Sequence, residues 1–286
     1  MLHINLTVNT GEVFGYLGPN GAGKTTTIRL IMGFIRPTRG SLKIFDIDAA
    51  RRAKDILGRV GYLPGEPSLY ENLTGAEFLR YFGRLRGGVD WDYVKELAER
   101  LRCSLGQRIG SLSHGGKQKI GLIQAFMHKP ELIILDEPSN GLDPLMQLEL
   151  HRTVLEAKLE GRTVFFSSHV LSEVQKVCDR VGIIRSGKLA GVEDVEALKT
   201  RALRHLTVRF ATSVPLEAFA GLPGVEEAFV EDHSLRCTLN GKPDALIKAA
   251  ARFEVTEVIS REPSLEDVFF SYYKDSTLER GVTGKN

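Results

Sequence analysis

The hydrophobic residues of this 286-residue chain fall into short continuous runs that alternate with helical stripes. The first run, residues 13–17, is apolar and β-prone, which is typical of a strand buried within a parallel sheet. Residues 131–135 and 163–166 repeat this character. The segment behind the first run has apolar residues at helical spacing, which are Ile28, Ile31, Met32 and Ile35. Strands that alternate with helices predict an α/β fold with a parallel sheet.

Residues 66–130 have mostly helical periodicity and predict a helical subdomain. Its clearest stripe follows Asp90, a typical N-cap residue, and consists of Val94, Leu97, Ala98 and Leu101. This spacing favours a face packed in the subdomain core over a partner site. Residues near Leu69, Tyr70 and Leu73 are better candidates for docking a partner.

A different pattern begins after residue 198, where short strand-like runs follow one another closely. The strand candidates are residues 205–210, 225–231, 235–239 and 253–260, and the helix candidates are residues 215–221 and 243–252. Their βαββαβ order predicts a small ferredoxin-like α+β domain over residues 199–275, after a first domain of residues 1–198. A capping-box pattern at Ser264 and Asp267 predicts a closing helix, and residues 276–286 are predicted to be disordered.

Charge and cysteine content exclude several classes of protein. Lys plus Arg number 38 against 36 Asp plus Glu, which gives no electrostatic case for a nucleic-acid partner. The three cysteines form no CxxC pair, a pattern that suits reduced thiols in the cytosol better than a disulfide framework. The apolar runs are far shorter than the ~18 residues of a membrane-spanning helix, and no signal peptide is identified. A membrane role would therefore need a partner chain.

The first apolar run leads directly into "GPNGAGKT", a G-x-x-x-x-G-K-T motif. Its glycines let backbone N–H groups converge on a phosphate, and the following helix adds its positive N-terminal end. The Lys24 side chain can reach the β and γ phosphates of a nucleotide, and the Thr25 hydroxyl can ligate Mg²⁺. An accidental glycine-rich turn is the alternative, and the flanking strand and helix weigh against it. The predicted phosphate-binding residues are Gly18, Pro19, Asn20, Gly21, Ala22, Gly23, Lys24, Thr25 and Thr26.

Two acids and a histidine follow the later strands. Asp136 and Glu137 end the run at residues 131–135, and strand alternation predicts that their side chains point to opposite sides. One acid can hold Mg²⁺ through water while the other polarises the attacking water as a general base. His169 ends the run at residues 163–168, where its imidazole can donate to a phosphate oxygen. Each feature alone has a structural alternative, a turn or helix cap for the acids and a backbone hydrogen bond for the histidine.

The run "SLSHGGKQKIGLIQAFMHKPELIILDEPSNGLDP", residues 111–144, resembles the core of ATP-binding cassette (ABC) transporter ATPases. With the glycine-rich loop and His169, the resemblance spans residues 1–190. It implies a P-loop NTPase fold in which the glycine-rich loop is the Walker A loop and Asp136 is the Walker B magnesium acid. Glu137 resembles the catalytic base of the family, and His169 resembles its switch histidine.

The resemblance also implies how two copies of the chain assemble. Ser113 and Gly115 correspond to the family signature that contacts the γ-phosphate held by a partner subunit, and Gly116 belongs to the same helix N-terminus. The family arrangement is a head-to-tail homodimer with ATP between the phosphate loop of one subunit and the signature of the other. Asp143 ends "SNGLD", which resembles the loop that links the two sites.

The sequence departs from the family pattern at three places. His114 replaces the first signature glycine, and Gly116 replaces the signature glutamine. Gly65 stands where the family has a glutamine that senses Mg²⁺ and the attacking water, and Glu66 is the nearest possible substitute. The opening "MLHINLTVNTGE" resembles the second strand of the cassette, so no residue is identified as the aromatic platform for adenine.

These observations favour the ATP-hydrolysing subunit of an ABC transporter. The ending of the chain resembles that of bacterial drug-exporter ATPases of the daunorubicin-resistance type, which implies export of small molecules. The implied partners are a second copy of the chain and a separate transmembrane permease, and the implied location is the cytoplasmic face of the membrane. Gly65 keeps open the alternative of a nucleotide-dependent switch with little hydrolysis.

Overall fold

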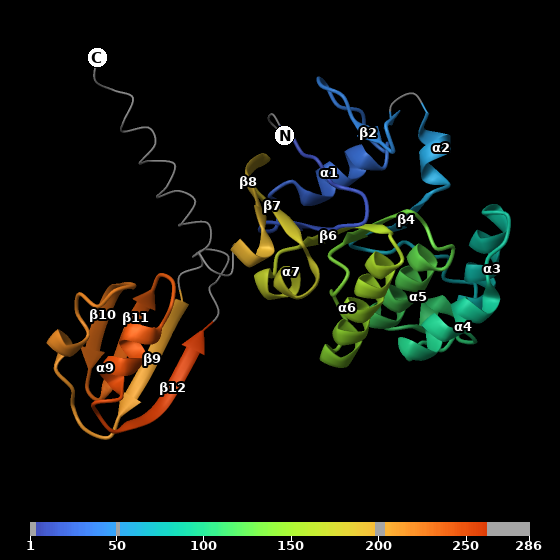
Figure 1. Cartoon of the computed structure of the whole chain (residues 1–286). Helices are drawn as coiled ribbons and strands as arrows, with labels where there is room; N and C mark the ends of the chain where they lie inside the picture. The colour runs from blue at the N-terminus through green and yellow to red at the C-terminus, as the bar shows by residue number, and fades with distance from the viewer. Residues whose placement is uncertain (1–3, 50–51, 198–203, 262–286) are drawn as a thin grey trace, which may run out of the picture. The chain divides into compact units, whose positions relative to one another are not determined.

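The computed structural model describes residues 4–49, 52–197 and 204–261 (Figure 1). The chain divides into two compact units, Met1–Asp194 and Val195–Asn286. The expected domain boundary after residue 198 lies outside the described residues, as do the expected helix from Ser264 and the expected disorder of residues 276–286.

The first unit is built on a sheet with the strand order β4-β5-β6-β1-β7-β8 among the described residues. The strands are β1 (Val13–Leu17), β4 (Val60–Leu63), β5 (Leu132–Asp136), β6 (Thr163–Ser168), β7 (Arg180–Arg185) and β8 (Lys188–Asp194). The pairs from β4 to β7 are parallel, as the sequence predicts, and β8 adds an antiparallel edge. Ser186 and Gly187 both have positive φ between β7 and β8, and this suits a tight hairpin turn.

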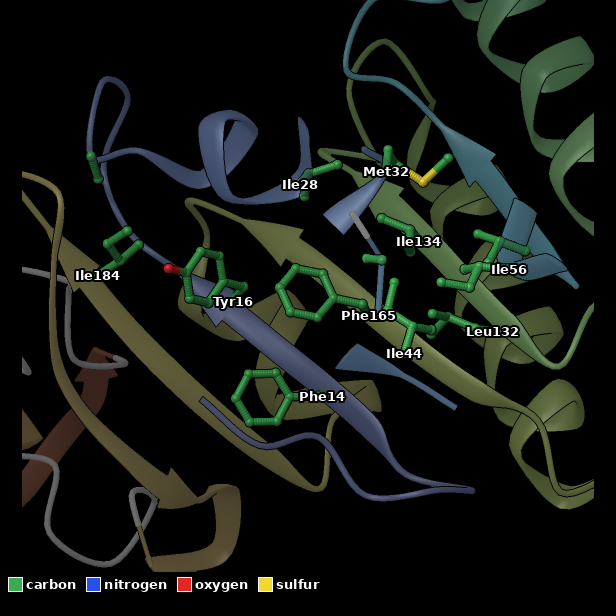
Figure 2. Close-up of a cluster of buried hydrophobic side chains, with 13 residues drawn as sticks. Phe14, Tyr16, Ile28, Met32, Ile44, Ile56, Leu132, Ile134, Phe165 and Ile184 are labelled. Carbon is green, nitrogen blue, oxygen red and sulfur yellow. The ribbon is translucent and has the colours of Figure 1, made fainter. Parts of the chain in front are cut away.

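Strand β1 lies in the middle of the sheet and is buried along its whole length. Phe14 and Tyr16 point to the face covered by α1 (Lys24–Ile31) and α2 (Ala53–Leu57), where both rings pack against Phe165 of β6 (Figure 2). Gly15 points to the other face, where α7 (Leu171–Val177) approaches so closely that a Cβ would collide with Val174. The short hairpin β2 (Lys43–Ile44) and β3 (Ile47–Asp48) lies on the α1 side (Figure 1).

Most of the segment between β4 and β5 is helical. It contains α3 (Gly75–Leu85), α4 (Trp91–Arg100), a 3₁₀ turn (Ile109–Ser111) and α5 (His114–Phe126). Asp90 caps α4 as expected, because its carboxylate accepts hydrogen bonds from the backbone N–H groups of Asp92 and Tyr93. The predicted apolar stripe of α4 is buried. Helix α5 packs against β4, so the subdomain is joined directly to the sheet.

The second unit contains an antiparallel sheet with the order β10-β11-β9-β12. Its strands are β9 (Arg204–Phe210), β10 (Val225–Glu231), β11 (Ser234–Leu239) and β12 (Val255–Arg261). This order is that of a ferredoxin-like sheet, and α9 (Asp244–Ala250) supplies the second helix. The first expected helix is only a 3₁₀ turn, Leu216–Ala218, because Pro215 and Gly221 leave too few residues for a stable helix between them.

Candidate functional site

The glycine-rich loop joins β1 directly to the eight-residue helix α1. Gly23 precedes the helix with φ 110°, a conformation that side chains rarely adopt. At Gly18 a Cβ would collide with the carbonyl oxygen of Ile184 on β7. Only glycine therefore allows the loop to lie this close to β7. A helix N-terminus that follows a glycine-rich loop is suited to binding an anion such as a phosphate group.

Lys24 is held inside this loop. Its side chain is 6% exposed, and its Nζ donates to the carbonyl oxygens of Gly18 at 2.6 Å and Pro19 at 3.2 Å. The same Nζ lies 2.9 Å from Glu137 Oε1. This carboxylate oxygen accepts no hydrogen bond, so the contact is an ion pair without hydrogen-bond alignment. The lysine is therefore positioned for an anion and is paired with the candidate base in this state.

Asp136 ends β5 next to the same loop. Its Oδ2 accepts a hydrogen bond from Thr25 Oγ1 at 2.9 Å, and its Oδ1 accepts one from Ser167 Oγ at 2.6 Å. Asp136 and Ser167 are register partners on β5 and β6, and both are buried. A carboxylate beside a threonine hydroxyl is a donor set that fits Mg²⁺, which completes its octahedron with water and substrate phosphate.

Glu137 does not follow the strand alternation. The strand ends at Asp136, and Glu137 adopts φ 49°, which is left-handed and uncommon for a residue with a side chain. Its carboxylate reaches Lys24, the neighbour of the threonine that Asp136 contacts. The prediction that the two acids point to opposite sides is therefore wrong, because the backbone turns at the strand end and brings both acids to one loop.

His169 follows β6 and completes the cluster. Its Nδ1 lies 2.7 Å from Glu137 Oε2. A carboxylate oxygen can only accept, so Nδ1 carries the proton and Nε2 is left to face other groups. The imidazole is 40% exposed, and this gives a bound anion access to it. Lys24 and His169 thus both contact Glu137, each through a different carboxylate oxygen.

The residues that resemble the signature lie at the start of helix α5. Ser113 is the N-cap of α5, and its Oγ accepts a hydrogen bond from the backbone N–H of Gly116 at 3.2 Å. Gly115 packs against the loop after Glu137 so closely that a Cβ would collide with the carbonyl oxygen of Gly141. Asp143 ends that loop as the N-cap of α6 (Pro144–Leu159), accepting from Met146 N at 3.0 Å.

One short segment therefore connects the two loops. It begins at Glu137, which contacts the phosphate loop, and continues to Gly141, which contacts the signature. Gln118 of α5 reinforces the connection by donating to the carbonyl oxygen of Pro138 at 3.1 Å. The five predicted residues Lys24, Thr25, Asp136, Glu137 and His169 meet at one site.

Two serines on β6 were not identified from the sequence. Ser167 orders the acid pair, because its hydroxyl donates to Asp136 and accepts from the backbone N–H of Glu137 at 3.1 Å. Ser168 donates to Glu173 Oε2 at 2.7 Å and accepts from the backbone N–H of Val170 at 3.0 Å. The available signal was the pair of hydroxyls at the end of "TVFFSS", where an apolar run becomes polar before the histidine.

Gly65 lies beside the acid pair. A Cβ at this position would stand 3.7 Å from Asp136 Oδ2, which is an ordinary contact distance. A side chain at position 65 would therefore reach Asp136. Glu66, the nearest possible substitute, is exposed. No helix among the described residues has the length and hydropathy needed to span a bilayer.

Comparison with known proteins identifies the family. Residues 1–140 match the family model described as ABC transporter. The chain is 41% identical over 207 residues to the bacitracin transport ATP-binding protein BcrA of Bacillus licheniformis, covering 71% of this chain and 68% of that protein. An uncharacterized ABC transporter ATP-binding protein of Alkalihalophilus pseudofirmus is 35% identical over 268 residues, which is 88% of this chain and 96% of its own length.

A solved structure described as the ATP binding subunit of an ABC transporter shares the fold. Its TM-score is 0.62 at 33% identity, and the match covers 68% of this chain and 83% of that chain. The matched 68% of this chain is about the length of the first unit, Met1–Asp194. The chain belongs to the ATP-binding subunits of ABC transporters and is an ATPase.

Proposed function

We propose that this chain powers a separate membrane permease for the export of small molecules, through a cycle of Mg²⁺-dependent ATP binding, dimerisation and hydrolysis. The observation that carries the proposal is the position of Glu137, between Lys24 at 2.9 Å and His169 at 2.7 Å, beside the Asp136–Thr25 pair. A base at the carboxyl edge of the sheet, next to a phosphate loop, is suited to activating water for attack on the γ-phosphate.

Each side chain then has a distinct role in hydrolysis. Lys24 exchanges its contact with Glu137 for a phosphate oxygen, and this frees the carboxylate to accept a proton from water. Asp136 and Thr25 would hold Mg²⁺, which would supply positive charge to neutralise the phosphates. The Nδ1–H of His169 donates to the Glu137 carboxylate and fixes its orientation. The left-handed backbone at Glu137 supports this role, since such strain is concentrated at functional sites.

The second part of the proposal is a composite site. Ser113, Gly115 and Gly116 lie at the N-terminus of the thirteen-residue helix α5, whose positive end favours an anion, and Ser113 is exposed. Within one chain Gly115 packs against Gly141. A second copy related by a two-fold axis would bring its signature to this phosphate loop and receive the same contact in return.

The permease is proposed to dock on the helical subdomain. Tyr70 is 52% exposed and packs edge-to-face against Phe78 and Tyr81 of α3, and Leu85 on the same helix is 67% exposed. Exposed apolar residues grouped in this way are typical of a protein-binding surface. A permease that docks here would hold the chain at the cytoplasmic face of the membrane. Transport of a small molecule is supported by the name of the BcrA relative, a bacitracin transport protein.

Mixing two inactive variants tests the composite site. Lys24→Ala removes the phosphate-loop cation, and Gly115→Asp places a carboxylate and a backbone clash in the signature. Each variant alone is expected to lose ATPase turnover. In an equal mixture, half of the dimers contain both variants and have one intact site of two, so about a quarter of the unmutated turnover should return. A mixture as inactive as its components contradicts the shared site.

A second candidate function is a nucleotide-dependent switch with little hydrolysis. It is favoured by Gly65, which offers no side chain to the attacking water although its Cβ position is 3.7 Å from Asp136 Oδ2. The turnover of the unmutated protein separates the two functions. A rate indistinguishable from that of Glu137→Gln supports the switch, and a rate at least a hundredfold higher supports the transporter ATPase.

A further inference from the structure

The sheet of the second unit has one face that its own core does not use. Leu206, Val208 and Leu235 point into the core of the unit, and side chains alternate along each strand. The intervening residues of β9 and β11 therefore face the other way. On this open face lies a cavity of about 310 Å³, whose walls include His205, Thr207, Arg209, Phe229, Arg236 and Ile259.

The strand register explains why the face is hollow. Phe229 of β10 is opposite Arg236 of β11, Arg236 is opposite Thr207 of β9, and Thr207 is opposite Ile259 of β12. One row of side chains thus crosses all four strands and has its shortest member, Thr207, between longer ones. His205 and Arg209, two residues to either side of Thr207 on β9, raise the remaining walls.

The basic side chains in the walls favour a negatively charged ligand. Among the residues that the structure describes, the walls include two arginines and a histidine and no acid. Arg209 is already paired with Glu257, at 2.6 Å. The pair between Arg236 and Glu231 is longer, 3.7 Å, and both side chains are about two-thirds exposed, so water weakens it. A guanidinium has five N–H donors, and one distant carboxylate leaves most of those of Arg236 available.

Phe229 gives the same site an apolar wall. Its ring is 63% exposed and lies opposite Arg236 in the strand register. Ile259 closes the opposite end of the row. The cavity volume is at the lower end of the range for small-molecule sites. The cavity combines apolar walls with the guanidinium of Arg236, whose N–H groups can bind an anion in a fixed direction.

We propose that this hollow binds a small organic anion with a flat apolar body, whose carboxylate, sulfonate or phosphate group pairs with Arg236 while its ring lies against Phe229. The bound molecule spans the row from Phe229 to Ile259 and covers Thr207. The site belongs to the second unit alone and is separate from the ATPase site. It gives this unit the character of an effector-binding module.

Two related dyes test the charge requirement on the full chain, with the ATP site filled by a non-hydrolysable ATP analogue. The first is 8-anilino-1-naphthalenesulfonate, and the second is N-phenyl-1-naphthylamine, which has the same rings without the sulfonate. Fluorescence titration is expected to give about tenfold tighter binding for the sulfonate dye, the value of one charge-assisted hydrogen bond. Equal affinity for the two dyes overturns the proposal, because it means apolar binding only.

Three variants locate the site. Arg236→Ala should weaken the sulfonate dye about tenfold and leave the neutral dye unchanged, whereas Phe229→Ala should weaken both dyes severalfold. The matched control is Arg252→Ala, an exposed arginine of the same unit that does not line the hollow. Unchanged titrations for both Arg236→Ala and Phe229→Ala overturn the proposal. Unchanged thermal unfolding of each variant shows that the effect is local, as expected for exposed side chains.

Discussion

Ser167→Ala isolates one hydroxyl that serves both acids of the ATPase site. Ser167 is fully buried, and its Oγ donates to Asp136 Oδ1 at 2.6 Å and accepts from the backbone N–H of Glu137 at 3.1 Å. A hydrogen bond to a charged group contributes roughly 1.5–3 kcal/mol, so the variant should lose about 2 kcal/mol of unfolding free energy. For a unit of this size that loss lowers the thermal midpoint by about 4–8 °C.

The functional effect of Ser167→Ala should appear in the Mg²⁺ requirement. Asp136 keeps its contact with Thr25 but loses the partner that fixes its other oxygen. Loss of a group that orients a metal ligand typically costs 10–100-fold in metal affinity or activity. We therefore expect the Mg²⁺ concentration that gives half-maximal ATPase turnover to rise at least tenfold. The assay is steady-state phosphate release across a Mg²⁺ titration at saturating ATP.

Ser168→Ala is the matched control for this experiment. Ser168 is the next residue of β6, is equally buried, and also donates to a carboxylate, that of Glu173, at 2.7 Å. Its loss should reduce stability by a similar amount without changing the Mg²⁺ requirement. If Ser167→Ala and Ser168→Ala have the same half-maximal Mg²⁺ concentration, the role assigned to Ser167 is refuted, because both effects would then be general destabilisation.

Three further changes test other contacts of the first unit. His169→Ala removes the donor to Glu137 Oε2 and should reduce turnover about a hundredfold while nucleotide affinity is retained. Single-turnover kinetics measure the rate, and equilibrium titration measures the affinity. A loss of affinity instead of rate would contradict this prediction. Gly65→Gln should fit without loss of stability. It should raise ATPase turnover above that of the Gly65→Ala control, because the glutamine amide can reach the neighbourhood of Asp136. Equal turnover of the two variants would show that the side chain at this position does not affect hydrolysis. Burial, followed by the charge of Arg86, lowers the pKa of His128 from 6.5 to about 4. The unfolded chain therefore binds a proton between these values that the folded chain does not, so stability should fall from pH 6.5 to pH 4, and His128→Gln should make urea unfolding less sensitive to pH in that window.

Sequence patterns were most informative where local chemistry and tertiary structure agree. The continuous apolar run at residues 13–17 became a fully buried central strand, and Asp90 capped α4 as its residue type predicts. The glycine-rich loop could be located because glycine is required at Gly18 and Gly23 for packing and backbone conformation. Such constraints act on the residue itself and leave a signal in the sequence.

Features that depend on tertiary contacts were harder to predict from the sequence. The turn of the backbone at Glu137 cannot be read from strand alternation, because it begins where the strand ends. The function of Ser167 depends on its register with Asp136, a pairing that brings together residues 31 positions apart. The second unit illustrates the same limit, since the apolar spacing before Gly221 suggested a helix and the short linker formed only a 3₁₀ turn.

The dependence of oligomeric mass on ATP in Glu137→Gln is the most direct test of the central claim. The substitution removes the carboxylate charge from Lys24 and the proposed base from the site, so a nucleotide-closed dimer should form and persist. Light scattering should give a mass of 31.7 kDa without nucleotide and twice that mass with Mg-ATP. A variant that binds ATP and remains at the mass of one chain would contradict the account, because the two anion-binding loops would then not meet across a dimer.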